Sequence, residues 1–303
     1  MKNKLNLIVV VVIAIATLAL ISCVKRPGSY ADSVGKKETV VLVGAGDIAD
    51  CRDLSGAEAT AKLLDQIPGT VMAVGDLAYP DGTKENFECY DRTWGRQKSR
   101  TRPAPGNHEF HSSAAAPYFD YFGSVAGASG DGYYSYELGA WHIVVLNSEC
   151  VDVGGCNAGS REEKWLRADL AAHPANCTLA YWHKPLFSSG GAHGNDPEIV
   201  PLWQALFDAG AEVVINGHDH NYERFAQQNP QGQPDPAHGI REFVVGTGGK
   251  NLRPFGSTQP NSEVRNNEAF GVLRLTLRSK SYDWQFISQQ GKAFADSGTA
   301  SCH

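Results

Sequence analysis

Short apolar runs alternate with segments of helical length along most of this chain, and that alternation limits the folds open to it. The apolar runs are too short for helices and rich in β-branched residues, so we read them as buried strands. They lie at residues 39–43, 70–74, 178–182 and 212–216. Helix-type patterns lie at residues 55–69, 160–174 and 196–210. Strands alternating with helices predict an α/β domain.

The remaining strand candidates favour two packed sheets over a single doubly wound sheet. YYSYEL and WHIVVLN, at 133–138 and 141–147, flank Gly139-Ala140 and read as a hairpin. The chain closes with strand-type runs at 241–246, 270–278 and 282–288. No internal repeat and no second linker is visible, so we expect one domain over residues 39–303.

The predicted helices carry start signals in their sequence. Two begin with a serine followed three residues later by a glutamate, which predicts a capping box: Ser55 with Glu58, and Ser160 with Glu163. The third helix has Asp196 as its expected cap, Pro197 in its first turn and Gly210 at its end.

The first residues have the architecture of an export signal. Lys2 and Lys4 precede an apolar run at 5–21, and the run ends in Leu-Ile-Ser-Cys. This ending resembles a bacterial lipoprotein signal. We therefore expect a signal peptide at 1–22 and a tether at 23–38 that starts at a lipidated Cys23. A permanent membrane anchor is the alternative, because the apolar run approaches the about 20 residues that span a bilayer.

Cysteine usage agrees with export. Apart from Cys23, the chain has an even set of cysteines: Cys51, Cys89, Cys150, Cys156, Cys177 and Cys302. An even number of cysteines in an exported chain suggests disulfides. The sequence has no Cys-x-x-Cys pair, which makes a zinc cluster less favoured. We expect the pair 150–156 across a glycine-rich loop, with 51–89 and 177–302 as the other two pairs.

The charge argues against general nucleic-acid binding. The formal charge is −6, and residues 1–22 carry two lysines and no acidic residue, so the domain without them is more acidic still. The basic stretch DRTWGRQKSRTR at 91–102 is the local exception. We read it as a solvated basic face, with attraction of anionic substrates as the alternative.

Polar residues of metal-binding type follow each of five apolar segments. They are Asp47, Asp76 with Tyr79, Asn107 with His108, His183, and His218 with His220. In open α/β sheets, ligand sites form where strands end at their carboxyl edge, so these loops can converge. Each residue alone could be an ordinary turn or packing residue. The occurrence of all five groups in this order, each after an apolar segment, is a much less probable coincidence.

Five blocks carry a family resemblance: GDIAD (46–50), GDLAY (75–79), GNHE (106–109), His183, and GHDHNYER (217–224). Together they resemble the calcineurin-like metallophosphoesterase superfamily. The tyrosine in GDLAY resembles the purple acid phosphatase branch, in a short, bacterial lipoprotein-type form. The resemblance covers about residues 40–285. It implies an α/β fold with a four-layer α/β/β/α sandwich of two mixed sheets flanked by helices.

The resemblance implies a binuclear metal centre. The first metal would be held by Asp47, Tyr79 and His220. The second metal would be held by Asn107, His183 and His218, and Asp76 would bridge both. Carboxylate and phenolate oxygens suit Fe³⁺, whereas imidazoles and an amide oxygen suit Zn²⁺, Mn²⁺ or Fe²⁺. A metal-bound hydroxide would then be the nucleophile.

Further residues take roles from the same resemblance. His108 would stabilise developing charge or protonate the leaving group, and His193 would be a second acid or a surface loop residue. Glu109 would anchor His108. Asp219 would point to the opposite side of its strand, and the GTGG loop at 246–249 would lie near the site. Glu223 and Arg224 would order the loop structurally.

The implied activity is hydrolysis of a small phosphate monoester by an exported, membrane-anchored acid phosphatase. A phosphodiesterase or nucleotidase on the same site is the first alternative. A non-catalytic surface binding protein and a metal-dependent oxidant are the others. No nucleic-acid partner is expected, and membrane contact would be through the lipid on Cys23.

Overall fold

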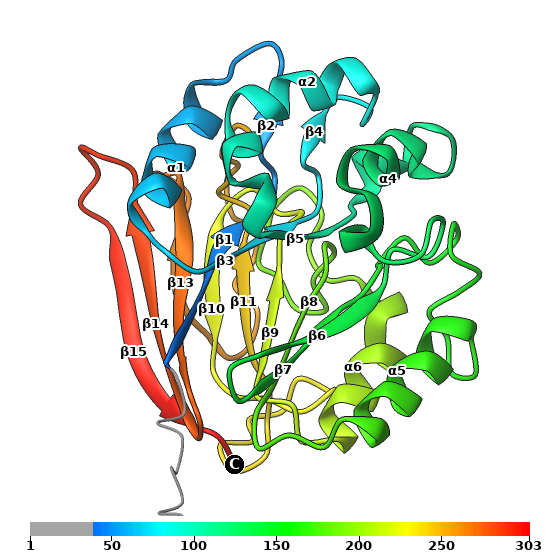
Figure 1. Cartoon of the computed structure of the whole chain (residues 1–303). Helices are drawn as coiled ribbons and strands as arrows, with labels where there is room; N and C mark the ends of the chain where they lie inside the picture. The colour runs from blue at the N-terminus through cyan, green and yellow to red at the C-terminus, as the bar shows by residue number, and fades with distance from the viewer. Residues whose placement is uncertain (1–38) are drawn as a thin grey trace, which may run out of the picture. The chain divides into compact units, whose positions relative to one another are not determined.

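Two β-sheets face each other in the computed structural model, which describes residues 39–303 (Figure 1). The predicted signal segment 1–22, the lipidated Cys23 and the tether 23–38 lie outside the described residues. Within the described part, no helix has the length and apolar composition that a bilayer crossing needs.

The first sheet has six strands in the order β15 (Ala295–Ser301), β14 (Ser281–Ser288), β13 (Gly271–Arg278), β1 (Val40–Ala45), β3 (Thr70–Val74) and β5 (Thr101–Ala104). β1, β3 and β5 run parallel, whereas β13, β14 and β15 pair antiparallel. The sheet is therefore mixed.

The second sheet has seven strands in the order β12 (Ser262–Asn266), β10 (Tyr222–Phe225), β11 (Arg241–Val245), β9 (Val213–Asn216), β8 (Thr178–Tyr181), β7 (Trp141–Val145) and β6 (Tyr134–Leu138). Its central strands β7, β8, β9 and β11 run parallel. The predicted hairpin is confirmed, because β6 and β7 pair antiparallel with Leu138 opposite Trp141. A further parallel pair joins β2 (Ala49–Asp50) to β4 (Ala78–Tyr79).

Helices border both sheets. They are α1 (Ser55–Gln66), α2 (Lys84–Arg92), α3 (Asn107–Phe110), α4 (Ala116–Phe122), α5 (Arg161–Ala172) and α6 (Val200–Asp208). Short 3-10 turns lie at Trp94–Arg100, Ser113–Ala115, Gly123–Ala126 and Pro197–Ile199. α1 packs against the first sheet, and α5 and α6 pack against the second. The predicted arrangement of two mixed sheets flanked by helices is confirmed.

Strand alternation builds the two apolar layers. Ile143 and Val145 of β7 pack in one cluster with residues of the first sheet, such as Val71. Val144, between them, packs with Trp203 and other residues of the helices on the outer face. Because successive side chains of a strand point to opposite faces, the near-continuous apolar runs in the sequence reflect burial on both sides.

Helix starts differ in part from the prediction. Ser55 does not cap α1; its backbone N–H donates to the Asp53 carboxylate at 2.9 Å, and Glu58 pairs with Arg96 instead. The cap at Ser160 is confirmed, because it accepts from the N–H of Glu163 at 3.2 Å, but the capping box is not closed, because the Glu163 carboxylate accepts from the N–H of Gly159 at 3.0 Å.

The third helix also starts differently. Asp196 caps a 3-10 turn there by accepting from the N–H of Glu198 at 3.0 Å, and α6 begins only at Val200. The predicted cap residue is therefore right, but the first turn is not α-helical.

The basic stretch at 91–102 is more structural than the predicted solvated face. Arg100 donates to the carbonyl of Leu64 in the last turn of α1 and to that of Gly69, in the turn that follows the helix. Arg96 pairs with Glu58 and Asp65 on that helix. These guanidinium groups therefore satisfy carbonyls and carboxylates of α1.

Three disulfides join the predicted pairs: Cys51–Cys89, Cys150–Cys156 and Cys177–Cys302. The last one ties the start of β8 to the end of the chain after β15. The expected pairing is confirmed.

Candidate metal centre

The loops predicted to converge do so at one edge of both sheets. Asp47 and Asp76 follow β1 and β3, and Asn107 follows β5 as the first residue of α3. His183 and His218 follow β8 and β9 of the second sheet. Because these strands are parallel within each sheet, their carboxyl ends deliver the side chains to a common place.

Two buried carboxylates lie at the centre of this place. Tyr79 Oη is 2.7 Å from Asp47 Oδ1 and 3.0 Å from Asp76 Oδ2. It also lies 3.2 Å from Nε2 of His220. Burial, followed by the two carboxylates, raises the pKa of Tyr79 well above its usual range. A phenolate at this position therefore needs a cation in contact with its oxygen.

The histidine rings are oriented by backbone carbonyls. Nδ1 of His183 is 3.0 Å from the carbonyl of Val74, and Nδ1 of His220 is 2.8 Å from the carbonyl of Asn251. A carbonyl only accepts, so each Nδ1 carries the proton and each Nε2 faces the site. His218 presents Nδ1 instead, 3.2 Å from Nε2 of His183. Burial lowers the pKa of His218 to about 2, with His183 adding to the effect, so this ring is neutral.

The residues present fit a pair of cations. Asp47 and Asp76 are 0% and 2% exposed, and their ion-pair partners among residues 39–303 are histidines, with no lysine or arginine. Oδ1 of Asn107 is buried and has no hydrogen-bond partner in the described part of the chain. Buried carboxylates and orphaned oxygens are costly unless a cation or donor compensates them. Metal ions would satisfy both conditions.

Backbone strain concentrates at three of these residues. Asp47, Asp76 and His218 have φ angles of 60°, 52° and 69°. Residues other than glycine rarely adopt this left-handed region, and those that do cluster at functional sites. Gly106 permits the close approach of a neighbouring loop, because a Cβ there would lie 2.4 Å from Asp76 Oδ1.

Glu109 holds the loops rather than the His108 ring that it was predicted to anchor. It is fully buried. Its Oε2 accepts from the N–H groups of Asp76 and Gly106, at 2.9 and 2.8 Å. Its Oε1 accepts from Leu77 and from the residue after it, at 2.9 and 3.2 Å.

The protonation state of Glu109 depends on the neighbouring charge. Burial, with Asp76 adding to it, raises the pKa of Glu109 to about 8 in the metal-free protein. Four donors, however, need both oxygens as acceptors. Cations beside Asp76 would neutralise the negative charge that helps to raise the pKa of Glu109. They would therefore favour the ionised form of Glu109.

The two predicted catalytic histidines lie on either side of the centre. Nδ1 of His108 contacts the carbonyl of Pro80, so its Nε2 faces Asp76 Oδ2 at 3.7 Å. His193 stacks on His218 with ring centroids 4.0 Å apart. Its Nε2 accepts from Arg253 at 2.8 Å.

Asp219 points away from the centre, as expected, and holds the loop that carries His193. Its carboxylate accepts from Ser188 and from the N–H of Gly194. On the next strand, Glu223 accepts from the N–H of Ser189 at 2.7 Å, which gives that glutamate its structural role.

The GTGG loop lies beside the centre, as expected. The N–H of Gly248 donates to the carbonyl of Gly46, and the N–H of Lys250 donates to that of Asp47. Sequence reasoning missed two cations just after this loop. Lys250 lies 4.7 Å from the ring centre of Tyr79, and Arg253 contacts His193. Both residues closely follow the GTGG loop, and this position could have identified them as residues near the site.

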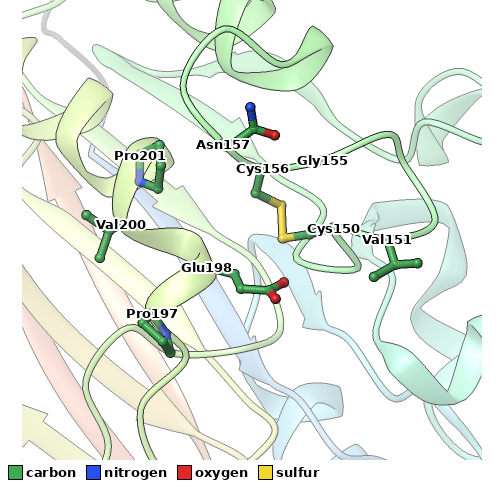
Figure 2. A pocket seen from close by; sticks show the side chains of 9 residues that line it. All are labelled: Cys150, Val151, Gly155, Cys156, Asn157, Pro197, Glu198, Val200 and Pro201. Atoms are coloured by element: carbon green, nitrogen blue, oxygen red, sulfur yellow. A yellow bond between two sulfur atoms is a disulfide. The ribbon is translucent and has the colours of Figure 1, made fainter.

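A separate pocket borders the Cys150–Cys156 disulfide (Figure 2). The start of α6 and the turn before it, with Pro197 and Val200, line the facing side. Val151, which is 91% exposed, lies on the disulfide loop. The pocket contains none of the nine predicted site residues.

The model of the calcineurin-like phosphoesterase family matches residues 33–222. The chain belongs to this family. Membership in the calcineurin-like phosphoesterases implies a binuclear metal centre.

Within the family, the chain is related to purple acid phosphatases. Purple acid phosphatase 15 of Arabidopsis thaliana is 27% identical over 228 residues, which is 62% of this chain and 41% of that protein. The chain spans about half the length of the curated relatives it matches.

Solved structures share the fold. The purple acid phosphatase PPD1 from yellow lupin has a TM-score of 0.75 at 18% identity, covering 87% of this chain and 54% of that one. GAP50, the anchor in the inner membrane complex of Plasmodium, has a TM-score of 0.69 at 13% identity, covering 88% and 89%.

Proposed function

We propose that this protein is an exported acid phosphatase that hydrolyses small phosphate monoesters at a binuclear metal centre. The observation that carries the proposal is the pair of buried carboxylates, Asp47 and Asp76, which are surrounded by donor atoms and have no lysine or arginine partner among residues 39–303. Similarity to Purple acid phosphatase 15 supports the monoester class.

The donor atoms divide into two sets around Asp76, which would bridge the metals. The first set combines oxygen donors with one imidazole and suits Fe³⁺: Asp47, Tyr79 and His220. The second set suits Zn²⁺, Mn²⁺ or Fe²⁺: Asn107, His183 and His218. When bound, the two metal ions supply an activated water molecule as nucleophile and neutralise phosphate charge.

The chain's own residues would handle the proton and orient the ester. His108 has Nδ1 occupied by Pro80, so any proton that it gives to the leaving oxygen comes from Nε2. Nε2 of His193 accepts from Arg253, which favours orientation of the substrate over proton donation at that atom. Glu109 would keep the Asp76 and Asn107 loops in place through its backbone hydrogen bonds.

The alternatives use the same site. A phosphodiesterase or nucleotidase would need the same metal ligands. A non-catalytic binding protein on this fold is expected to lose ligands. All seven candidate ligands are present here.

Hydrolysis of a nitrophenyl phosphate monoester and of the matching diester tests the proposal, with Asp76→Asn beside the wild type. Removing the bridging charge should reduce turnover by about 10³-fold, which is the scale of losing several kcal/mol of transition-state stabilisation. Asp208→Asn, at an exposed ion pair with Arg167, is the matched control and should retain activity. Diester-only turnover would select the alternative enzyme, and activity on neither ester with metals bound would refute the hydrolase.

Export is supported by the three disulfides, which persist in oxidising compartments. We further propose that residues 1–22 are removed and that Cys23 carries the lipid anchor. Mass spectrometry of the purified protein tests this. An N-terminal peptide with an unmodified Cys23 would contradict it.

A further inference from the structure

A second cluster of histidines and carboxylates lies at the other end of the second sheet from the candidate metal centre. His142 is near the start of β7 and is paired with Thr178 at the start of β8, whereas His183 follows the end of β8. Asp169 lies in the last turn of α5, and His173 is the residue that caps that helix. The elements that carry the cluster, β6, β7 and α5, are neighbours in Figure 1. The phosphoesterase chemistry uses none of these residues.

His142 is held between two carboxylates. Its Nδ1 is 2.7 Å from Glu137 Oε1, and its Nε2 is 2.8 Å from Asp169 Oδ2. The ring is 1% exposed. A neutral imidazole has one N–H, and if that proton goes to Glu137, two acceptors face each other across 2.8 Å. At this separation a second proton must therefore lie between Nε2 and Asp169, and a metal ion would enter only if the two atoms moved apart.

His173 supplies a third donor at metal-ligand spacing. Its Nδ1 lies 3.2 Å from Asp169 Oδ1 and also 2.9 Å from the backbone carbonyl of Asp169, so this exposed ring must turn away from that carbonyl to bind an ion. The ring stacks on that of His142 with centroids 5.0 Å apart. One ligand atom from each of the three residues lies within 4.8 Å of the others. Ligands of one tetrahedral zinc ion, at about 2.0–2.1 Å from it, are roughly 3.4 Å apart, so a small opening of the cluster admits the ion.

The charge of the cluster is compatible with a divalent ion. Neither Glu137 nor Asp169 has a lysine or arginine ion-pair partner within residues 39–303; their partners are histidines. With neutral rings the two carboxylates carry two negative charges, which a divalent cation balances and a single proton does not. The His173 side chain is 48% exposed and lines an open hollow with Pro174 and Thr178, which gives the ion a path from solvent.

We infer that His142, Asp169 and His173 form a zinc-binding site that joins the β6–β7 hairpin to the end of α5. Two imidazoles and one carboxylate match zinc, and the exposed side of the cluster leaves a position for water. Glu137 is the positioning residue, because a carboxylate on Nδ1 fixes the tautomer that presents Nε2 to the metal. The inference does not rest on the proposed function.

Zinc analysis of the full-length protein tests the inference. Wild type, His173→Gln and Asp169→Asn are dialysed against low-micromolar Zn²⁺, and bound zinc per folded chain is measured. Wild type should retain one more zinc than either variant, whatever the candidate metal centre holds. His238→Gln, at a histidine with a 76% exposed side chain outside the cluster, is the control and should match wild type. Circular dichroism confirms folding of each variant.

Glu137→Gln separates a zinc site from a purely structural histidine–carboxylate network. The zinc affinity of this site should fall about 10–100-fold while its stoichiometry at saturating Zn²⁺ stays the same. Equal zinc content in wild type and both ligand variants would overturn the inference, as would binding of the extra ion only at millimolar Zn²⁺. Nitrophenyl phosphate turnover should be unchanged in His173→Gln, so a failed phosphatase assay does not bear on this result.

Discussion

The substitution Glu109→Gln should destabilise the protein although it changes neither the size nor the shape of the side chain. Both carboxylate oxygens of Glu109 accept two backbone N–H groups each, including those of Asp76 and Gly106. A glutamine has one oxygen and one NH₂ group. Two of the four N–H groups would therefore lose their acceptor and face another donor.

The magnitude follows from those two lost bonds. Hydrogen bonds to a charged group are worth about 1.5–3 kcal/mol each, so the loss should be about 3–6 kcal/mol in the free energy of unfolding. The same loops carry Asp76 and Asn107, so we also expect lower metal content and lower turnover. Urea unfolding of the metal-loaded protein at pH 7, followed by tryptophan fluorescence, measures the first effect, and metal analysis measures the second.

Glu162→Gln is the matched control. Glu162 is also fully buried, but only its Oε1 accepts, from the N–H of Asn147 at 2.7 Å, and its Oε2 has no partner among the residues that the structure describes. Burial raises the pKa of Glu162 to about 8, so a neutral amide suits the site. This variant removes a cost of about 3 kcal/mol at pH 7, since the folded carboxyl holds its proton against an unfolded pKa near 4.5. Its NH₂ group would lack an acceptor, which costs about 1–3 kcal/mol, so the expected net change is a small gain or none. A stable, metal-replete Glu109→Gln variant, or equal losses at both positions, would refute the reasoning.

Three further outcomes are expected. Tyr79→Phe should bleach the visible band of an iron-loaded protein, and a variant that keeps its colour would remove Tyr79 as a ligand. Between pH 5 and 7, wild type should lose about 1.4 kcal/mol of stability per pH unit relative to Glu162→Gln, because the folded state keeps a proton that the unfolded state releases; parallel pH profiles from urea titrations would contradict this. Replacing Cys177 and Cys302 by serine should cost about 2–5 kcal/mol in the same assay, and an unchanged midpoint would argue against the bridge.

Much of the fold was readable because strands buried on both faces leave long apolar runs. β1, β3, β8 and β9 were predicted for that reason. β15 was missed because it is an edge strand with a largely exposed, polar sequence, ADSGTAS. Its pairing with β14 is set by tertiary context, and local patterning does not report such context.

The sequence predicted which side chains form the candidate site. It did not predict which hydrogen bonds hold those side chains in place. Each predicted ligand follows a strand end, where spacing gives its place. The role of Glu109 was misassigned, because proximity in sequence suggested the His108 ring while its hydrogen bonds go to the backbone of other loops. Arg253 was missed, because its contact with His193 joins segments far apart in the chain.

Because β13 comes late in the chain but pairs with β1, the first sheet can be completed only after most of the chain has been made. β1, which leads to Asp47, lies between β3 and β13, so its second edge stays open until residues 271–278 have been made and delivered. During the export proposed above, a chain still crossing a translocation channel would present all seven candidate ligands while one sheet lacks half its strands. Stable metal loading would then come after translocation ends, and the ions would be drawn from the compartment that receives the folded chain.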